Sequence, residues 1–281
     1  MKLRISIIIT FITIAIFGFK LNNEKLSDPE KEKVLLEIVK YVVERGHYSS
    51  IQIDDDLSLK IFDDFINKLD PQKRFFTLSD IKELDRFKYK IDDQIKAYDL
   101  EFFEEIHDRY RSRIAEAKIF VEKAFENNFD FNDKEYIDLD IDSMPFSSDK
   151  NQLYERWRKQ IKYSILDIIS QKNSSDSIDD NVIMMNAIST VKKSTNDFFN
   201  YANEIERDDW FSVFLNSFVG QFDPHTFYFK PDDKEKFDVS ISGNFDGIGA
   251  RLSKADGNVK IVDVIIGCLL YTSPSPRDSD Q

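Results

Sequence analysis

The chain has 281 residues, enough for one or two domains with a sizeable buried core. Its 25 phenylalanines stand against only 8 glycines and 7 prolines, so it is short of the turn residues that a many-stranded protein needs, which favours helices. With 52 acidic and 39 basic residues the formal net charge is −13, which disfavours binding to nucleic acid or to anionic lipid.

The first segment has the pattern of a signal peptide. Lys2 and Arg4 precede an uncharged apolar run from Ile5 to Phe19, and polar sequence follows. The run is shorter than the about 20 residues of a typical membrane-spanning helix, but no small-x-small cleavage site follows it. Residues 1–22 are therefore predicted to be a signal peptide, with an uncleaved N-terminal anchor as the alternative.

The stretch 28–222 is predicted to be a helical domain, because apolar residues recur there at helical spacing. The first predicted helix follows Asp28–Pro29. Its predicted apolar face consists of Val34, Leu35, Ile38, Val39 and Val42. The second helix spans Leu57–Leu69 and ends at Asp70–Pro71, because a proline disfavours helical backbone in the residue before it.

A long helical pattern follows, from about Thr77 to Asn127. It exceeds the usual length of a globular helix, so we expect a break near Tyr98–Asp99. Residues 127–145 are acidic and interrupted, which is typical of a loop. Three more helices are then predicted, at Leu153–Ile169, Asn181–Tyr201 and Asp208–Phe218.

The pattern changes after Gly220, where prolines and glycines cluster. The spacing of apolar residues there is typical of strands. It alternates at Phe237, Val239 and Ile241, and a β-branched run follows at Val259–Ile266. We therefore expect a linker at 223–237 and a second, strand-containing domain from residue 238.

Histidine and cysteine give no sign of a metal site. The three histidines, His47, His107 and His225, belong to no paired motif, and Cys268 is the only cysteine. Neither a metal, another cofactor nor a disulfide is therefore expected. His107 lies among charged residues of a predicted helix, and we expect it at the surface.

The linker begins with Asp223, Pro224, His225 and Thr226, and an Asp-Pro pair favours a turn. One interpretation pairs Asp223 with His225 as an acid–base couple. The other is a rigid linker that aromatic side chains anchor, Tyr228 among them, and the sequence favours this second interpretation.

Gly247 and Gly249 flank Ile248 directly before a predicted strand. Glycines there let successive backbone N–H groups converge on an anion, and a strand offers its edge to an extended peptide. Both features are needed to hold a peptide by its C-terminal carboxylate. A short G-x-G segment also marks ordinary tight turns, so the pattern alone leaves both interpretations open.

Taken together, these motifs resemble the tail-specific proteases, a family of C-terminal processing peptidases. The resemblance covers about Asp28–Gly267 and rests on LDPQKRFFTLSDIKEL, YERWRKQIKYSILDI, FDPHTFYFKP, FDVSIS and DGIGARL. It implies export to the periplasm, with anchoring in the inner membrane as the alternative. It also implies a helical N-terminal domain, a PDZ domain that binds the substrate's C-terminus and a protease core with a Ser-Lys dyad.

By this resemblance, Gly247, Ile248, Gly249 and Ala250 form the carboxylate-binding loop, and residues 238–267 are the first strands of a truncated PDZ domain. The fold class is then mainly α, a helical N-terminal domain followed by those strands. The implied partners are the C-terminal tails of unfolded or tagged proteins and a periplasmic adaptor. Contact with a membrane is expected only through the N-terminal segment.

Residues 268–281 resemble translated adapter sequence, so we expect a non-native tail there. The resemblance places the catalytic serine and lysine in a core that does not precede this tail. The chain as it stands is therefore expected to be the inactive N-terminal region of a serine endopeptidase. The alternative is a non-catalytic periplasmic helical scaffold that binds peptides.

Overall fold

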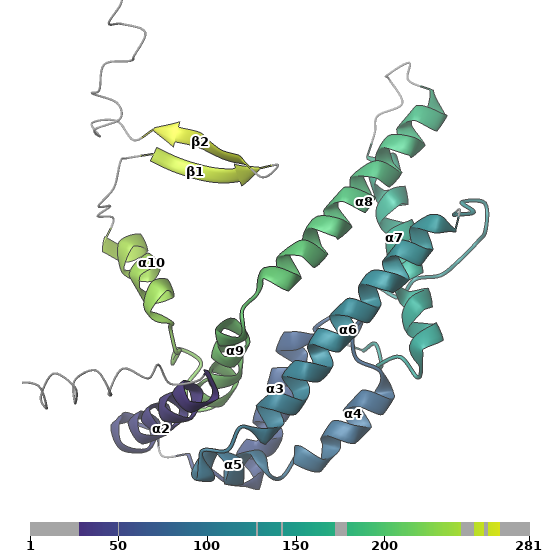
Figure 1. Cartoon of the computed structure of the whole chain (residues 1–281). Coiled ribbons are helices and arrows are strands. Elements are labelled where there is room, and N and C mark those ends of the chain that lie inside the picture. The colour runs from purple at the N-terminus through teal and green to yellow at the C-terminus, as the bar shows by residue number, and fades with distance from the viewer. Residues whose placement is uncertain are drawn as a thin grey trace, which may run out of the picture. The chain divides into compact units, whose positions relative to one another are not determined.

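The computed structural model describes residues 28–49, 51–127, 129–141, 143–171, 179–242, 250–255 and 258–264 (Figure 1). The chain divides into two compact units, with the boundary between Tyr228 and Phe229. The described residues are mainly helical, which confirms the predicted fold class. None of their helices is both long and apolar enough to cross a bilayer. The predicted N-terminal segment 1–22 and the predicted tail 268–281 lie outside the described residues.

The second predicted helix is confirmed as α3 (Asp55–Leu69). The Asp54 side chain caps its start by accepting a hydrogen bond from the Leu57 backbone N–H at 3.1 Å. The helix ends at Asp70, directly before Pro71, as predicted. Its buried residues are Leu57, Ser58, Ile61, Phe62, Phe65, Ile66 and Leu69.

The first predicted helix is confirmed as α2 (Asp28–Gly46), but its predicted apolar face is right only in part. Leu35 and Val39 of that face are half-buried and pack against the core. The members of that face that are exposed are Val34, Ile38 and Val42. Leu36 and Val43 are buried instead, on the same face as the buried Glu32. Glu32 forms an ion pair with Arg207 at 2.7 Å. Because α2 carries two apolar stripes, spacing alone does not decide which one is buried, and this ion pair favours the stripe that contains Leu36.

The long helical pattern between Thr77 and Asn127 is divided more often than predicted. Its elements are α4 (Leu78–Leu84), the 3-10 helix η1 (Asp85–Phe87), α5 (Ile91–Ala97) and α6 (Glu101–Glu126). The predicted break near Tyr98 is confirmed, since Tyr98 has a φ of 56° and ends α5 in the left-handed region. The break before Ile91 is not predicted. There the Ile91 backbone N–H donates to the Ser58 hydroxyl at 2.8 Å, a partner that comes from α3.

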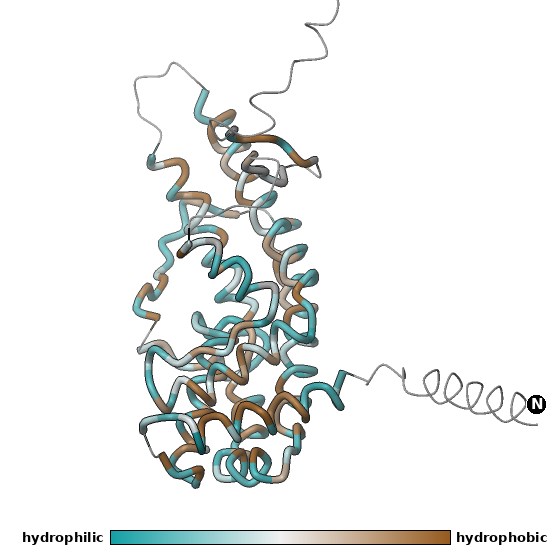
Figure 2. The backbone as a smooth tube through the Cα atoms, turned by 90° about the vertical axis from the view of Figure 1, so that its left-hand side faces the viewer, coloured by the Kyte–Doolittle hydropathy of each residue, from teal (hydrophilic) through white to brown (hydrophobic). Residues whose placement is uncertain are grey.

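The last helices of the first unit are also confirmed. They are α7 (Lys150–Ser170), α8 (Asp180–Glu204) and α9 (Arg207–Val219). Helices α6, α7 and α8 run side by side, and α9 packs against α2 and α3 (Figure 1). Hydrophobic and hydrophilic residues alternate along the helices in Figure 2, as expected for helices that each bury one face.

The core accounts for the many phenylalanines. Rings from α3, α6 and α9 pack with centroid separations between 5.1 and 6.4 Å. These rings are Phe62, Phe65, Phe102, Phe103, Phe211 and Phe214. Each pair at such a separation contributes roughly 0.5–1.5 kcal/mol beyond its burial, so the cluster stabilises the helical unit without any strand.

His107 is buried, and the expectation that it lies at the surface is wrong. Its ring stacks on Phe103, one helical turn earlier, with the centroids 5.6 Å apart. Burial lowers the pKa of the imidazole. Helical spacing from Phe103 decides the position of His107, whereas the charged neighbours in sequence point away from the core.

The second unit contains α10 (Pro231–Ser242) and a hairpin of two antiparallel strands, β1 (Ala250–Ala255) and β2 (Asn258–Val264). The register pairs Ala250 with Val264 and Ala255 with Asn258, and a bulge lies between Arg251 and Leu252. Strand β2 confirms the strand predicted at Val259–Ile266 as far as Val264, because the two residues beyond it lie outside the described residues.

The strand predicted at Phe237, Val239 and Ile241 is wrong, because these residues belong to α10. This helix also begins within the predicted linker 223–237. Pro231 occupies its first position, which suits a residue without a backbone N–H. Lys234 pairs with Asp238 at 2.5 Å, and such a pair at a spacing of four residues favours a helix over a strand.

Candidate functional site

The start of the predicted linker is attached to the helical unit through the two residues that follow α2. The Tyr48 hydroxyl donates a hydrogen bond to the Asp223 carboxylate. His47 Nε2 lies 3.2 Å from the Thr226 hydroxyl, and the His47 and Tyr48 rings stack at 4.7 Å. The hydrogen bond from Tyr48 lowers the pKa of Asp223, so the acceptor stays ionised at neutral pH.

Helix α9 supplies a second attachment, through Asn216. Its Nδ2 donates to the Tyr228 carbonyl at 3.0 Å, and the Tyr228 backbone N–H donates to Asn216 Oδ1 at 2.7 Å. Both polar groups of the Tyr228 backbone are thereby satisfied by one side chain. The last residue of the first unit is therefore fixed to the helical core.

Asp223 and His225 do not meet through their side chains. The Asp223 carboxylate accepts the backbone N–H of His225 at 2.6 Å, and the His225 side chain is exposed. The Asp223 carbonyl accepts the Thr226 N–H at 3.1 Å, which closes a turn around the exposed Pro224. This arrangement holds the chain in place and gives no acid–base couple.

Of the predicted carboxylate-binding residues, Gly247, Ile248 and Gly249 lie outside the described residues. Ala250 is the first residue of β1, so a strand follows the glycine segment directly, as the sequence predicts. Within the described residues β1 pairs with β2 alone. In the part of the chain that the structure describes, one edge of β1 therefore has no partner strand.

The turn after α3 is built around Asp70, which is 1% exposed. Its carboxylate accepts the backbone N–H groups of Arg74 at 2.8 Å and of Phe75 and Phe76 at 2.9 Å. Burial raises the pKa of Asp70, and the three N–H donors act in the opposite direction. Hydrogen bonds to this buried side chain thus fix the conformation of residues 70–76, called the Asp70 turn below.

Side chains of α7 donate hydrogen bonds to backbone carbonyls of the Asp70 turn. Trp157 Nε1 donates to the Arg74 carbonyl at 2.8 Å. Arg156 donates to the Lys73 carbonyl, and to the Pro145 carbonyl at 2.9 Å. Two motifs that lie far apart in the sequence, LDPQKRFF and YERWRKQIKY, therefore form one structural unit.

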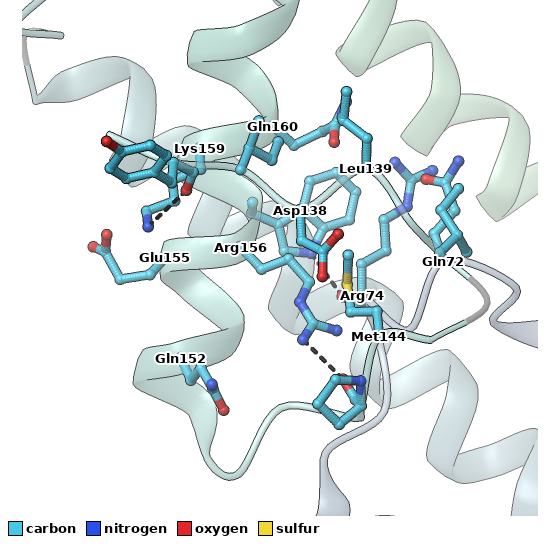
Figure 3. Close-up of a pocket in the computed structure, with 15 residues that line it drawn as sticks. Gln72, Arg74, Asp138, Leu139, Met144, Gln152, Glu155, Arg156, Lys159 and Gln160 are labelled. Carbon is cyan, nitrogen blue, oxygen red and sulfur yellow. Dashed lines mark hydrogen bonds between the residues drawn. The ribbon is translucent and has the colours of Figure 1, made fainter. Parts of the chain in front are cut away.

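A pocket of about 420 Å³ opens beside the Asp70 turn (Figure 3). Its apolar lining residues are Tyr136, Ile137, Leu139, Ile141, Met144 and Trp157. Figure 3 shows Arg74, Arg156 and Asp138 among the charged residues around it. A volume of this size is typical of sites for small molecules or single side chains.

Glu135 attaches the loop that lines this pocket to α7. Its carboxylate accepts hydrogen bonds from Arg158 and, at 2.7 Å, from Lys162. The bond from Arg158 is the main cause that lowers the pKa of Glu135 to about 2, from a usual value of 4.5. Because the folded-state pKa is depressed, the ion pairs stabilise the fold fully above pH 4.5, and this contribution is lost as the pH falls toward 2.

We expect Glu135→Gln to lower the free energy of unfolding by about 1–2 kcal/mol at pH 7, because it leaves the buried Lys162 without its carboxylate. At about pH 2.5 the loss should be much smaller, since most of the ionic contribution has gone. Urea denaturation at both pH values measures this. Glu122→Gln, at an exposed position of α6, is the control. An equal loss at the two pH values would rule out the ionic origin.

Sequence alone does not single out His47, Tyr48 or the pocket arginines. Their partners lie far along the chain, 175 residues away for Tyr48 and Asp223. Asn216 carries a signal that could have been used, because it is a polar residue between the buried Leu215 and Ser217 of α9. A polar side chain at such a position needs a partner, and here the partner is the linker backbone.

Comparison with known proteins identifies the family of the first unit. The family model described as the tail specific protease N-terminal domain matches residues 38–232, which include the Asp70 turn and the attached segment Asp223–Tyr228. The chain is also 28% identical over 244 residues to a tail-specific protease of Haemophilus influenzae. That match covers 84% of this chain and 33% of the relative, so the chain spans about a third of the relative's length. The chain belongs to the family of the tail-specific protease N-terminal domain.

Proposed function

We propose that this chain is the N-terminal region of a periplasmic serine endopeptidase that recognises its substrates by their C-termini. Family membership supports proteolysis as the activity of the whole protein. The observation that carries tail recognition is the hairpin of β1 and β2. It follows the glycine segment 247–249 directly and leaves one edge of β1 open within the described residues. In this proposal the hairpin belongs to a PDZ domain.

Recognition would use the backbone in two ways. The N–H groups of Gly247, Ile248, Gly249 and Ala250 would bind the terminal carboxylate, while the substrate's last residues pair with an open strand edge. The Ile248 side chain would contact the last apolar side chain of the substrate. The substrates would be unfolded or tagged proteins, delivered directly or by a periplasmic adaptor.

Cleavage would be the task of a Ser-Lys dyad in a separate core. The serine hydroxyl attacks the scissile carbonyl, and the neutral lysine amine takes the hydroxyl proton and passes it to the leaving amine. The region described above would bind and position the substrate and would not itself cut it. The N-terminal segment 1–22 would direct export.

A titration with labelled peptides tests this proposal. The 281-residue chain is added to a peptide of about ten residues that ends in an apolar residue, either as the free acid or as the C-terminal amide. Fluorescence anisotropy should show the free acid binding at least about tenfold more tightly, because charge-assisted hydrogen bonds hold the carboxylate. Ile248→Asp should weaken binding of the acid by a similar factor.

Ile119→Asp, at an exposed position of α6, is the control and should leave binding unchanged. Equal affinity for acid and amide would refute carboxylate recognition by residues 247–250 of this chain. Cleavage of the peptide by this chain would refute a separate catalytic core. Tail binding by a full-length protein that cuts no substrate would favour the non-catalytic scaffold instead.

A further inference from the structure

We propose that the pocket beside the Asp70 turn is a binding site for an organic carboxylate with an apolar body, held by Arg74. This site lies wholly within the first unit and does not involve the glycine segment 247–249. It is therefore independent of the proposed recognition of substrate tails, and the two can fail separately.

The guanidinium of Arg74 is prepared to bind an anion. Its central carbon lies 4.6 Å from the Trp157 ring centroid and 5.1 Å from that of Phe198. Aromatic rings thus lie against the guanidinium, an arrangement that leaves the N–H groups at its edge available for hydrogen bonds. A stacked guanidinium with free N–H groups at its edge matches the two oxygens of a carboxylate.

The described residues do not supply that carboxylate. No carboxylate of the described residues lies within salt-bridge distance of Arg74. The Arg74 side chain also forms no hydrogen bond with a described residue. Asp70, the nearest acidic side chain in sequence, uses its oxygens on three backbone N–H groups. Burial lowers the pKa of Arg74, because it removes water from the charged guanidinium. The charge of Asp70 offsets only part of the cost of burying Arg74, because burial still lowers the pKa of the guanidinium. An anionic ligand that bonds directly to the guanidinium would offset more of that cost.

Arg156 adds a second positive charge to the same pocket. It donates to the carbonyls of Lys73 and Pro145, so it is held in place, and it too has no carboxylate partner among the described residues. Burial also lowers the pKa of Arg156. Two arginines without a salt bridge to any described carboxylate therefore line one pocket. Asp70 and Asp138 lie near enough to raise the pKa of Arg156, but neither forms an ion pair with it.

The rest of the pocket selects the body of the ligand. Leu139, Ile141, Met144 and the Trp157 ring form an apolar wall, which favours an aliphatic or aromatic group over a sugar or a phosphate. A volume of about 420 Å³ admits a medium-chain fatty acid or the last residues of a peptide. The shared chemistry is a carboxylate attached to an apolar group.

Isothermal titration calorimetry on the 281-residue chain tests the site with two matched pairs of probes. The first pair is decanoate and decanol, and the second is N-acetyl-Phe-Leu as the free acid and as the amide. We expect the acid of at least one pair to bind about tenfold or more tightly than its neutral partner. Arg74→Gln should abolish that difference.

A variant that binds the acid more tightly than the wild type cannot owe its behaviour to unfolding, so such a variant is included. Asp138→Asn removes a negative charge from the pocket and should tighten binding of the acid about threefold. Arg111→Gln, at an exposed position of α6, is the control for charge and should have no effect. In the wild-type chain and in Arg111→Gln, whichever acid binds should also quench the fluorescence of Trp157, which lines the pocket.

Each outcome of the titrations either supports or overturns the site. Binding of decanoate alone identifies a lipid-derived acid, and binding of the peptide acid alone identifies a peptide C-terminus; either supports the site. Equal binding of acids and neutral partners, no binding of any probe, or an unchanged preference in Arg74→Gln overturns it. An Ile248→Asp variant should keep the pocket's affinity even where it loses tail binding.

Discussion

Replacing Asp70 by alanine is expected to lower the free energy of unfolding by about 3–5 kcal/mol, a large share of a domain's stability. The substitution removes the acceptor of three backbone N–H groups, those of Arg74, Phe75 and Phe76. Phe75 and Phe76 are buried, so water cannot replace the lost oxygens without opening the core. Urea denaturation at pH 7, followed by far-ultraviolet circular dichroism, measures the change.

Asp70→Asn is expected to cost about 2–3 kcal/mol, because its amide NH₂ would face one of the N–H donors while its oxygen still accepts from the others. Asp63→Ala, at an exposed position of α3, should stay within about 0.5 kcal/mol of the wild type. A loss below about 1 kcal/mol for Asp70→Ala would mean that the turn holds its shape without the carboxylate.

Arg207→Met is expected to cost about 3–5 kcal/mol at pH 7, because it leaves Glu32 charged and without a partner in the core. Arg207 donates two hydrogen bonds to Glu32, at 2.8 and 2.7 Å, and two more to Glu104. Glu32 is 3% exposed, and burial raises its pKa. Because a raised folded-state pKa favours the protonated form, the loss should be smaller near pH 4 than at pH 7.

The double variant Glu32→Leu with Arg207→Met should recover most of the lost stability, since an apolar pair of similar size needs no counter-charge. Arg45→Met, at an exposed position of α2, is the control and should change stability by less than about 0.5 kcal/mol. Urea denaturation of the four proteins at both pH values completes the comparison. If the double variant were no more stable than Arg207→Met, a buried unpaired charge would not be the cause.

Sequence patterns predict a helix or strand correctly when the residues that determine it lie within or next to that element. Helix α3 is one example, because its apolar spacing and Pro71 are both close in sequence. The same reasoning fails for the rotation of α2, which depends on Arg207, and for the start of α5, which depends on Ser58. The prediction for α10 fails for a different reason, because the residues that favour a helix there are present in the local sequence. Proline at its first position and the Lys234–Asp238 pair outweigh the alternating apolar residues.

The candidate sites follow the same division. The turn at Asp223–Pro224 and the strand after the glycine segment are local features, and the sequence predicts both. The partner of Asp223, Tyr48, lies 175 residues away and carries no local signal. The pocket is harder still, because it joins the Asp70 turn, the loop with Asp138 and the α7 residues around Arg156. No single segment contains enough of it to suggest a site.

The ion pairs of Arg207 also bear on the order in which the chain assembles. Arg207 lies 175 residues after Glu32 and 103 after Glu104, so these contacts close long loops, and such contacts form late in folding. During synthesis, α2 leaves the ribosome long before α9 exists, while Leu36 and Glu32 still face water. Helix α2, which is made before the other described helices, is therefore among the last to dock onto the core.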